Sequence, residues 1–231
     1  MPITVREANT LCADVVDSMA AWPTLYTAMQ SGGFEKNGTY IINKSLEKLV
    51  TSRNAANAPG VSDSIILREY RQIDYAIITS TIAQQKLSVE TVIEVKCNYA
   101  YQLGEITARV PGGINQACGY CQEEAVAADA YVLYFVAAPY INALPLPPRN
   151  AGWRYWGTPL RPAMLQPAID VMRIAVNAAG ATIIGEASAY ASVLGIPPVG
   201  VNPNLYCALI KCQCNALNME LAQNPLEPLD S

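Results

Sequence analysis

Short apolar runs rich in β-branched residues, bounded by polar residues, occur in the middle of the chain and are typical of β-strands. Asp74 to Thr79 is one such run, and Thr91 to Lys96 is a second one after an eleven-residue connection, Ser80 to Glu90. Because successive side chains on a strand point to opposite faces, Glu94 and Lys96 share one face. The apolar residues that flank Glu94 point the other way, into a core.

The hydrophobic pattern also predicts the elements around these two strands. In chain order we expect a helix within 5–29, a short strand at 39–42, a helix at 44–53 capped by Asn43, a strand at 65–71, a helix at 114–128 entered through Pro111 and Gly112, a buried strand at 130–137, two helices within 164–194 separated at Gly180, and a late strand at 205–211 at a sheet edge. The order helix, three strands, helix, strand predicts an α/β fold with a mixed central sheet flanked by helices.

A carboxylate and an ammonium group two residues apart on an apolar strand are costly to bury unless a ligand occupies the space above them. A divalent metal ion and a phosphate would fit that space. If Asp74 begins the neighbouring strand, its carboxylate lies beside that of Glu94, and two like charges this close call for a cation. Together with Lys96, these two carboxylates predict metal-assisted chemistry on a phosphate.

The spacing of these residues resembles the motif of the PD-(D/E)XK nuclease superfamily, an aspartate at the start of one strand and Glu-x-Lys on the next. In this chain Asp74 is followed by nineteen residues and then by Glu94-Val95-Lys96. Ile73 stands where the family name has its proline, a position that is loosely kept in the family. A second match is Gln116-Ala-Cys-Gly-Tyr120, which is similar to the QxxxY motif of the RecB-like branch. Gln116 and Tyr120 share one face of the expected helix.

The resemblance implies a restriction-endonuclease-like αβββαβ core and a defined set of site residues. It implies Mg²⁺ or Mn²⁺ held by Asp74, Glu94 and the carbonyl of Val95, catalysis by Lys96, and positioning of the nucleophile and the nucleic-acid backbone by Gln116 and Tyr120. Carboxylate and carbonyl oxygens suit these metal ions. Many family members place one more acidic residue on the first core helix, and Glu47 is the candidate here. The alternative is a solvated Glu47 that pairs with Lys44 or Lys48.

The function implied by the resemblance is metal-dependent hydrolysis of phosphodiester bonds by an enzyme of the restriction, defence or toxin type. The expected substrate is DNA. A metal ion in such a site activates water and neutralises charge on the phosphate. The expected partners are nucleic acid and either a second copy of the chain or an inhibitory or immunity protein, with no membrane. One alternative is a non-catalytic module of the same fold that binds a nucleic acid or a protein. Another is an unrelated α/β binding protein in which Asp74 and Glu94 lie far apart.

Composition narrows the possible chemistry. The chain of 231 residues contains no histidine, which excludes Ser-His-Asp and Cys-His catalysis, nucleases of the ββα-metal type and His-ligated zinc enzymes. The formal net charge of −4 argues against a broad basic surface for nucleic acid, although a local groove and metal ions would supply positive charge.

We expect one domain over 1–231, with its core at about 40–140, a proline-rich loop at 142–167 and a helical and strand extension at 164–223.

Four arginines are candidates for contacts with nucleic acid. Arg68 and Arg71 accompany the strand expected before Asp74, where they face a phosphate or are ordinary surface arginines. Arg149 and Arg154 lie in the proline-rich loop among tryptophans and tyrosines, and such a mixture stacks on bases and binds phosphates. The alternative, which we favour for this loop, is that it wraps the domain with its aromatic residues packed inward.

The cysteines are odd in number and irregularly spaced: Cys12, Cys97, Cys118, Cys121, Cys207, Cys212 and Cys214. With no signal peptide, this usage predicts reduced thiols in a cytoplasmic, soluble protein. Some RecB-like nucleases hold an iron–sulfur cluster by one N-terminal and three C-terminal cysteines, but the spacing here is unlike theirs. The CxxC at 118–121 lacks a second CxxC for zinc. We therefore expect the cysteines to serve as small buried hydrophobic residues.

Overall fold

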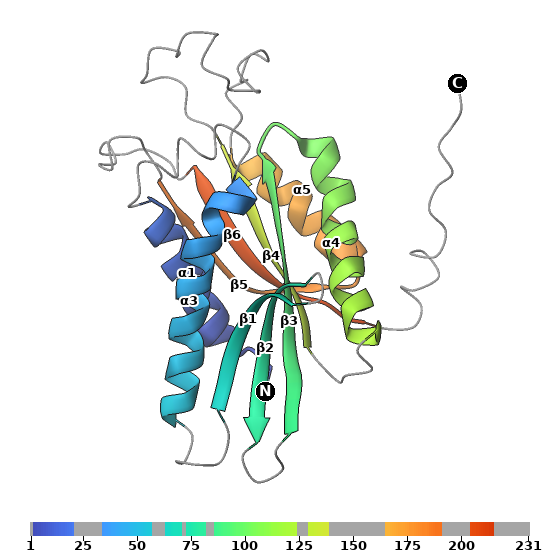
Figure 1. Cartoon of the computed structure of the whole chain (residues 1–231). Helices are drawn as coiled ribbons and strands as arrows, with labels where there is room; N and C mark the ends of the chain where they lie inside the picture. Colours follow the sequence, from blue (N-terminus) through green and yellow to red (C-terminus); the bar gives the residue numbers. More distant parts are fainter. Residues whose placement is uncertain are drawn as a thin grey trace, which may run out of the picture.

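The computed structural model describes residues 2–20, 34–56, 63–70, 73–81, 86–123, 129–138, 165–190 and 204–214. These residues form a mixed six-stranded sheet with helices on both faces (Figure 1). The helices are α1 (Val5–Ala20), α3 (Phe34–Ala56), α4 (Leu103–Glu123) and α5 (Leu165–Ala178), and the strands are β1 (Asp63–Tyr70), β2 (Ile73–Thr81), β3 (Lys86–Tyr99), β4 (Asp129–Ala137), β5 (Thr182–Ala189) and β6 (Leu205–Lys211). The expected α/β class with a mixed, helix-flanked sheet is confirmed.

The sheet changes direction at one pair of strands. Its strand order is β1-β2-β3-β4-β6-β5, in which β3 and β4 are parallel and every other neighbouring pair is antiparallel. Helix α4 provides the crossover that a parallel pair requires. The long strand β3 pairs with β2 as far as Ile93 and with β4 from Thr91 to Tyr99. The candidate site lies where β3 passes from one neighbour to the other.

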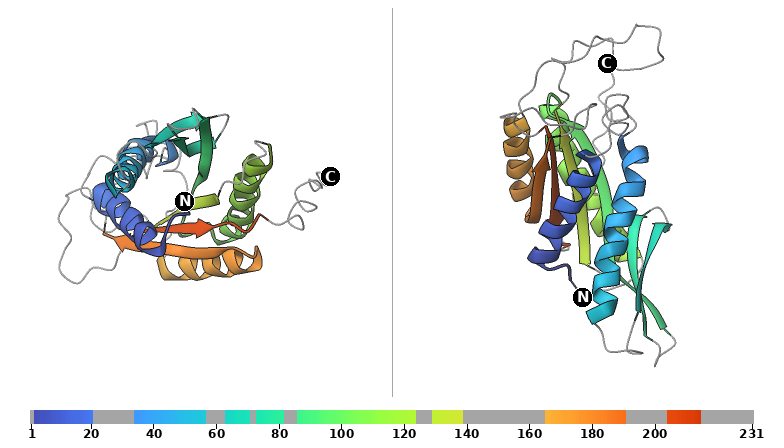
Figure 2. Two further views of the ribbon diagram at one scale, coloured as in Figure 1. Left: turned by 90° about the horizontal axis from the view of Figure 1, so that it is seen from below. Right: turned by 90° about the vertical axis from the view of Figure 1, so that its left-hand side faces the viewer.

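Each face of the sheet has its own helical layer and its own core (Figure 2). Helices α1 and α3 cover one face, where Met19 and Leu46 belong to the same buried cluster as Phe135. Helices α4 and α5 cover the other face, where Ile114 belongs to a cluster with Val132. Because side chains alternate along β4, this strand contributes to both cores, and its side chains from 130 to 137 are all buried.

Helix α3 replaces a strand that the sequence pattern predicted. The expectation was a strand at 39–42 followed by a helix from 44, whereas one continuous helix spans Phe34–Ala56. Ile42, Leu46 and Val50 are buried at helical spacing, and the side chain of Tyr40 is 57% exposed. The prediction of a strand at 39–42 was wrong because the β-branched residues of this short run also fit a helical period that continues through Val50.

The connection between β2 and β3 is shorter than expected. Strand β2 continues to Thr81 and β3 begins at Lys86, so the predicted eleven-residue connection was wrong. Pairs such as Ile78 with Val89 extend the antiparallel ladder through a segment whose polar residues had indicated a loop. Backbone hydrogen bonds form the ladder, so polar side chains such as that of Ser88 do not by themselves end a strand.

The C-terminal part contains a strand where a second helix was expected. Helix α5 ends before Gly180, whose φ of 68° is the left-handed conformation common after a helix C-terminus. The chain then forms β5, which lies at the edge of the sheet. Strand β6 was predicted correctly as a strand but wrongly as an edge, because it lies between β4 and β5. Two hydrogen-bonded neighbours explain why its residues from Leu205 to Ile210 are all buried.

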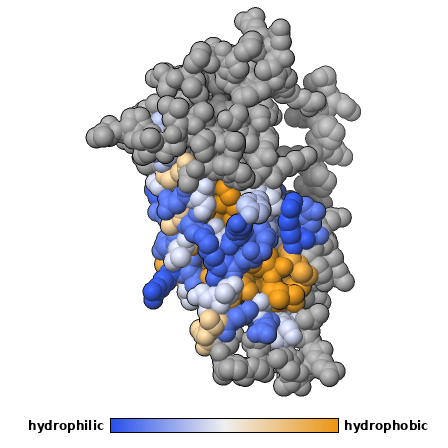
Figure 3. All heavy atoms as spheres, turned by 60° about the vertical axis from the view of Figure 1, so that its left-hand side comes forward, coloured by the Kyte–Doolittle hydropathy of each residue, from blue (hydrophilic) through white to orange (hydrophobic). Residues whose placement is uncertain are grey.

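The surface of the described residues carries few large apolar side chains, and these belong to different elements. Those exposed are Val5, Tyr40, Ile65, Leu103 and Ile174. Figure 3 shows one face on which hydrophilic residues predominate and apolar residues gather in a smaller area. None of the described helices combines the length and the apolar character needed to cross a membrane.

Candidate active site

Asp74 and Glu94 lie beside each other where β2 and β3 separate. The last described pair of their ladder is Tyr75 with Ile93, and the next step of this register places Asp74 opposite Glu94. Beyond this step β3 no longer has β2 as its neighbour. Asp74 Oδ2 accepts a hydrogen bond of 2.8 Å from the backbone N–H of Val95. A side-chain oxygen thus takes the place of a strand carbonyl and holds the Asp74 carboxylate against β3.

Glu94 is a buried carboxylate with one oxygen left for a ligand. Its side chain is 3% exposed and forms an ion pair with Lys96 Nζ. Among the described residues, Glu94 Oε2 has no hydrogen-bond partner. Burial raises the pKa of the Glu94 carboxyl to about 7, the hydrogen bond from Lys96 opposes this shift, and the charge of Asp74 adds to it. A charge that is costly to bury, beside a second carboxylate, is a feature of functional sites.

Lys96 connects these carboxylates to α4. Its Nζ donates a hydrogen bond of 3.0 Å to Gln116 Oε1, and Gln116 Nε2 donates one of 2.7 Å to the Tyr120 hydroxyl. Burial raises the pKa of Tyr120; the hydrogen bond from Gln116 opposes this shift, and the charge of Glu94 adds to it. The side chains that the resemblance implied for catalysis therefore form one continuous series of contacts.

The position of Gln116 and Tyr120 along their helix differs from the expectation. Helix α4 begins at Leu103 and contains Pro111 in its interior, so it does not begin at residue 114. Ile106, Val110 and Ile114 are buried at helical spacing on both sides of the proline, which keeps the helix continuous. Gln116 and Tyr120 consequently lie in its second half. They are therefore too far from the helix N-terminus for its free backbone N–H groups to bind a phosphate beside them.

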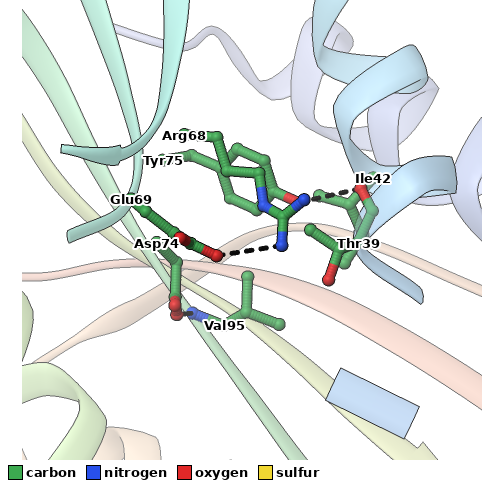
Figure 4. A pocket seen from close by; sticks show the side chains of 7 residues that line it. All are labelled: Thr39, Ile42, Arg68, Glu69, Asp74, Tyr75 and Val95. Carbon is green, nitrogen blue, oxygen red and sulfur yellow. Dashed lines mark hydrogen bonds and ion pairs between the residues drawn. The ribbon is translucent and has the colours of Figure 1, made fainter. Parts of the chain in front are cut away.

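Asp74 also borders a pocket of about 200 Å³ on the α3 side of the sheet. Its walls are Thr39, Ile42, Arg68, Glu69, Asp74, Tyr75 and Val95 (Figure 4). The Arg68 guanidinium lies inside this ring of residues and forms an ion pair of 2.9 Å with Glu69. Arg68 pairs with Tyr75 across the β1–β2 ladder and shares its face, so it lies on the other side of the sheet from Lys96.

Glu69 is a site residue that the sequence analysis did not identify. It is a non-glycine residue with a positive φ of 53°, beside Asp74 in the same pocket. Such a conformation costs free energy and is concentrated at functional sites. No local sequence signal, such as glycine or asparagine, marks the position.

The remaining candidates have other surroundings. Glu47 is exposed on α3, and its carboxylate accepts a hydrogen bond of 2.6 Å from Asn43 Nδ2. Glu47 is therefore a solvated side chain, which was the alternative to a metal ligand. Lys48, one of its two expected partners, forms an ion pair with Asp14 instead. The candidate nucleic-acid contacts Arg71, Arg149 and Arg154 lie outside the described residues.

The donor set at Asp74 and Glu94 fits a hard divalent cation. Two adjacent carboxylates offer only oxygen ligands, and one of these oxygens, Glu94 Oε2, is buried without a hydrogen-bond partner among the described residues. Among the described residues there is no group of three or more Asp, Glu or Cys side chains able to hold a metal ion. Mg²⁺ commonly binds through one or two carboxylates, with water and substrate phosphate filling its other positions, so two carboxylates suffice.

The cysteines depart from the expected reduced state at one place. Cys118 and Cys214 form a disulfide, whereas Cys12, Cys97, Cys121, Cys207 and Cys212 are buried thiols. Cys12 and Cys207 belong to the core under α1, while Cys212 belongs to the core under α4. Because the sheet separates these thiols, they do not share an iron–sulfur cluster.

Comparisons with protein-family models, with curated proteins and with solved structures gave no match. The resemblance to the PD-(D/E)XK superfamily therefore rests on the residues of two motifs and on the order of the elements.

Proposed function

We propose that this chain is a metal-dependent nuclease of the PD-(D/E)XK type that hydrolyses phosphodiester bonds, with DNA as the expected substrate. The observation that carries the proposal is the contact series from Glu94 through Lys96 to Gln116 and Tyr120, with Asp74 opposite Glu94 in the register of β2 and β3. These residues come from two strands and a helix, and no local rule of chain geometry would bring them together. The order α3-β1-β2-β3-α4-β4 supports a restriction-endonuclease-like core.

Asp74, Glu94 and the Val95 carbonyl would hold the Mg²⁺ or Mn²⁺ ion. A metal ion bound there lowers the pKa of a coordinated water and neutralises charge on the phosphate. The Lys96 ammonium, which in this structure neutralises Glu94, orients the attacking water or stabilises the charge that develops on phosphate oxygens. Gln116 directs that ammonium by accepting one of its hydrogen bonds, and its own amide is oriented by Tyr120.

The pocket that Asp74 borders lies on the α3 side of the sheet, away from Lys96, and would receive a part of the substrate beyond the scissile phosphate. Arg68 provides a cation there, with a side chain that is 51% exposed. The guanidinium is well matched to phosphate oxygens in shape and charge. Because the chain is acidic overall, with a net charge of −4, local cations of this kind must supply the attraction for a polyanion.

The test is cleavage of plasmid DNA, single-stranded DNA and RNA in the presence of Mg²⁺ or Mn²⁺. Wild type is compared with Asp74→Ala and Lys96→Ala at equal folded stability, and Lys48→Ala serves as control because this exposed lysine pairs with Asp14 away from the site. We expect both site variants to lose ~10²–10³-fold in rate and the control to keep wild-type activity. The substrate that is cleaved identifies the class of nucleic acid.

Two outcomes would contradict the proposal. Activity that survives both site variants would place the chemistry elsewhere. A wild-type protein that cleaves none of these substrates and binds no Mg²⁺ by calorimetry would favour the alternative, a non-catalytic module that binds a nucleic acid or a protein partner through the same fold.

A further inference from the structure

Four cysteines from two distant segments gather at the end of α4. Cys118 and Cys121 lie on α4, and Cys212 and Cys214 follow β6. Cys118 and Cys214 are joined by a disulfide across 96 residues of sequence, with a Cα–Cα distance of 5.2 Å. Cys121 and Cys212 are buried in the same core as Cys118. Two cysteines from each segment thus meet at a single place between helix and sheet.

The Cys214 side of the disulfide is attached to a rigid part of the sheet. Strand β6 is hydrogen-bonded to β4 on one side and to β5 on the other. After the strand, the backbone N–H of Cys212 donates a hydrogen bond of 2.9 Å to the Ala130 carbonyl, and Lys211 Nζ lies 3.1 Å from Asp129 Oδ1. The chain that leads to Cys214 is therefore held against the start of β4.

The Cys118 side belongs to the turn of α4 that reaches the candidate active site. Cys118 lies between Gln116 and Tyr120 in sequence and is 5% exposed, facing the core, while Gln116 points to Lys96. Fixing Cys118 to the end of β6 consequently fixes the helical turn that carries Gln116 and Tyr120.

We propose that Cys118 and Cys214 are a redox site, at which a dithiol reductant or a disulfide oxidant determines how firmly the second half of α4 is held against the sheet. In the disulfide form Gln116 contacts Lys96, as the structure shows. In the dithiol form α4 loses its covalent attachment to β6. The consequence for activity rests on the proposed nuclease function, whereas the consequence for α4 does not.

The chemistry is ordinary thiol–disulfide exchange. One thiolate of an external dithiol attacks the Cys214 sulfur, which belongs to an exposed residue, and forms a mixed disulfide while Cys118 leaves as a thiolate. The second thiol of the reductant then attacks the mixed disulfide and releases Cys214. The two electrons come from the dithiol, which becomes a disulfide, and both released thiolates take up protons.

The neighbouring thiols do not compete for this bond. Burial raises the pKa of Cys121 to about 11 and that of Cys212 to about 12, and the Asp129 and Cys121 charges respectively add to these shifts. Because the thiolate is the attacking species, both thiols are poor nucleophiles at neutral pH. The Cys118–Cys214 bond is thus protected from internal exchange and responds to an external reagent.

The experiment is hydrogen–deuterium exchange followed by mass spectrometry on the full chain, oxidised and then treated with tris(carboxyethyl)phosphine or a dithiol. Alkylation before and after reduction reports which cysteines are bonded. We expect Cys118 and Cys214 to resist alkylation until they are reduced. We also expect exchange in peptides covering 114–123 to become at least ~5-fold faster on reduction, with peptides of β4 and β6 unchanged.

Two variants keep the test decisive. Cys214→Ser, at an exposed position, should show fast exchange in 114–123 at all times and no response to reductant, whereas Cys121→Ala retains the bond and should respond as wild type. Alkylation of Cys118 and Cys214 in the oxidised protein, or equal exchange in both redox states, would overturn the proposal. Metal-dependent cleavage of nucleic acid is measured on the same samples. If neither redox state cleaves but exchange in 114–123 still depends on the redox state, the nuclease proposal is overturned and the redox proposal is not.

Discussion

Lys96 Cγ lies 3.0 Å from the position that a Cβ atom on Gly113 would occupy. Lys96 Cε and Val132 Cγ1 are each 3.5 Å from the same point. The missing side chain of Gly113 therefore creates the space in which the Lys96 side chain passes between β3 and α4 to reach Gln116. On this geometry Gly113 is a positioning residue for Lys96.

Replacing Gly113 should affect the site more than the fold. Gly113→Ala improves helix propensity by ~1 kcal/mol but pushes the Lys96 side chain aside, so we expect little net change in stability and a ~10-fold lower kcat with KM unchanged. Gly112→Ala and Gly119→Ala are matched controls on the same helix, because a Cβ at either position meets nothing within 4 Å. Both controls should raise the melting temperature and keep activity. Equal activity in all three variants would show that Gly113 has no role in positioning.

Glu94 should make the stability of the protein depend on pH near neutrality. Its pKa in the folded protein is raised from 4.5 to about 7, chiefly by burial, so its contribution to stability is complete below pH 4.5 and is lost as the pH rises through 7. Between pH 5 and 8, wild type should lose about 2 kcal/mol relative to Glu94→Gln, which does not titrate. The chain contains no histidine to obscure this window. Urea unfolding at several pH values is the measurement, and parallel curves for the two proteins would contradict the prediction.

The same Glu94→Gln variant should separate folding from metal binding. The neutral amide fills the space of the carboxyl group and removes a like charge beside Asp74, so the variant should be as stable as wild type or more stable at pH 8. It should nevertheless bind Mg²⁺ at least ~10-fold more weakly, because a carboxylate ligand is lost. Calorimetric titration with Mg²⁺ alone measures this, and unchanged binding would remove Glu94 from the set of ligands.

Glu7 and Arg53 should stabilise the fold far from the candidate site. Their side chains form an ion pair of 2.8 Å and are 26% and 7% exposed respectively. The hydrogen bond from Arg53 lowers the pKa of Glu7 to about 2, so its contribution is present above pH 4.5 and is lost as the pH falls toward 2.

We expect Glu7→Gln to cost about 2 kcal/mol at pH 7, and a difference from wild type that shrinks as the pH falls below 4. Asp17→Asn, at an exposed position of the same helix, is the control and should change stability by less than ~0.5 kcal/mol. Denaturant unfolding at pH 7 and pH 3 tests both variants. A cost for Glu7→Gln that is independent of pH would indicate a packing effect instead of an ionic one.

Gly185 should be indispensable for the packing of α1 on the edge strand β5. A Cβ atom there would lie 2.7 Å from the Asn9 backbone nitrogen and would also touch the Ala8 backbone. Because backbone atoms of a packed helix cannot move independently, Gly185→Ala should lower the free energy of unfolding by about 3 kcal/mol. Gly104→Ala is the control, since nothing lies within 4 Å of its Cβ position. Equal melting temperatures for the two variants would refute this account.

The relations that depend on chain geometry over a few residues could be predicted from the sequence. Alternation along a strand places Glu94 and Lys96 on one face, and a spacing of four residues places Gln116 and Tyr120 on one face of a helix. The strands at 65–71, 130–137 and 205–211 were also predicted, because each combines apolar residues with a length typical of strands. Such patterns are local, and the sequence by itself determines them.

Relations between distant segments were decided only by the tertiary structure. The sequence did not show that β6 lies inside the sheet, that Cys118 meets Cys214, or that Gly113 leaves room for Lys96. Each of these depends on which strands become neighbours and on how closely a helix packs on them. Many pairings satisfy the same local hydrophobic pattern, and the burial of both faces of the sheet at once selects among them.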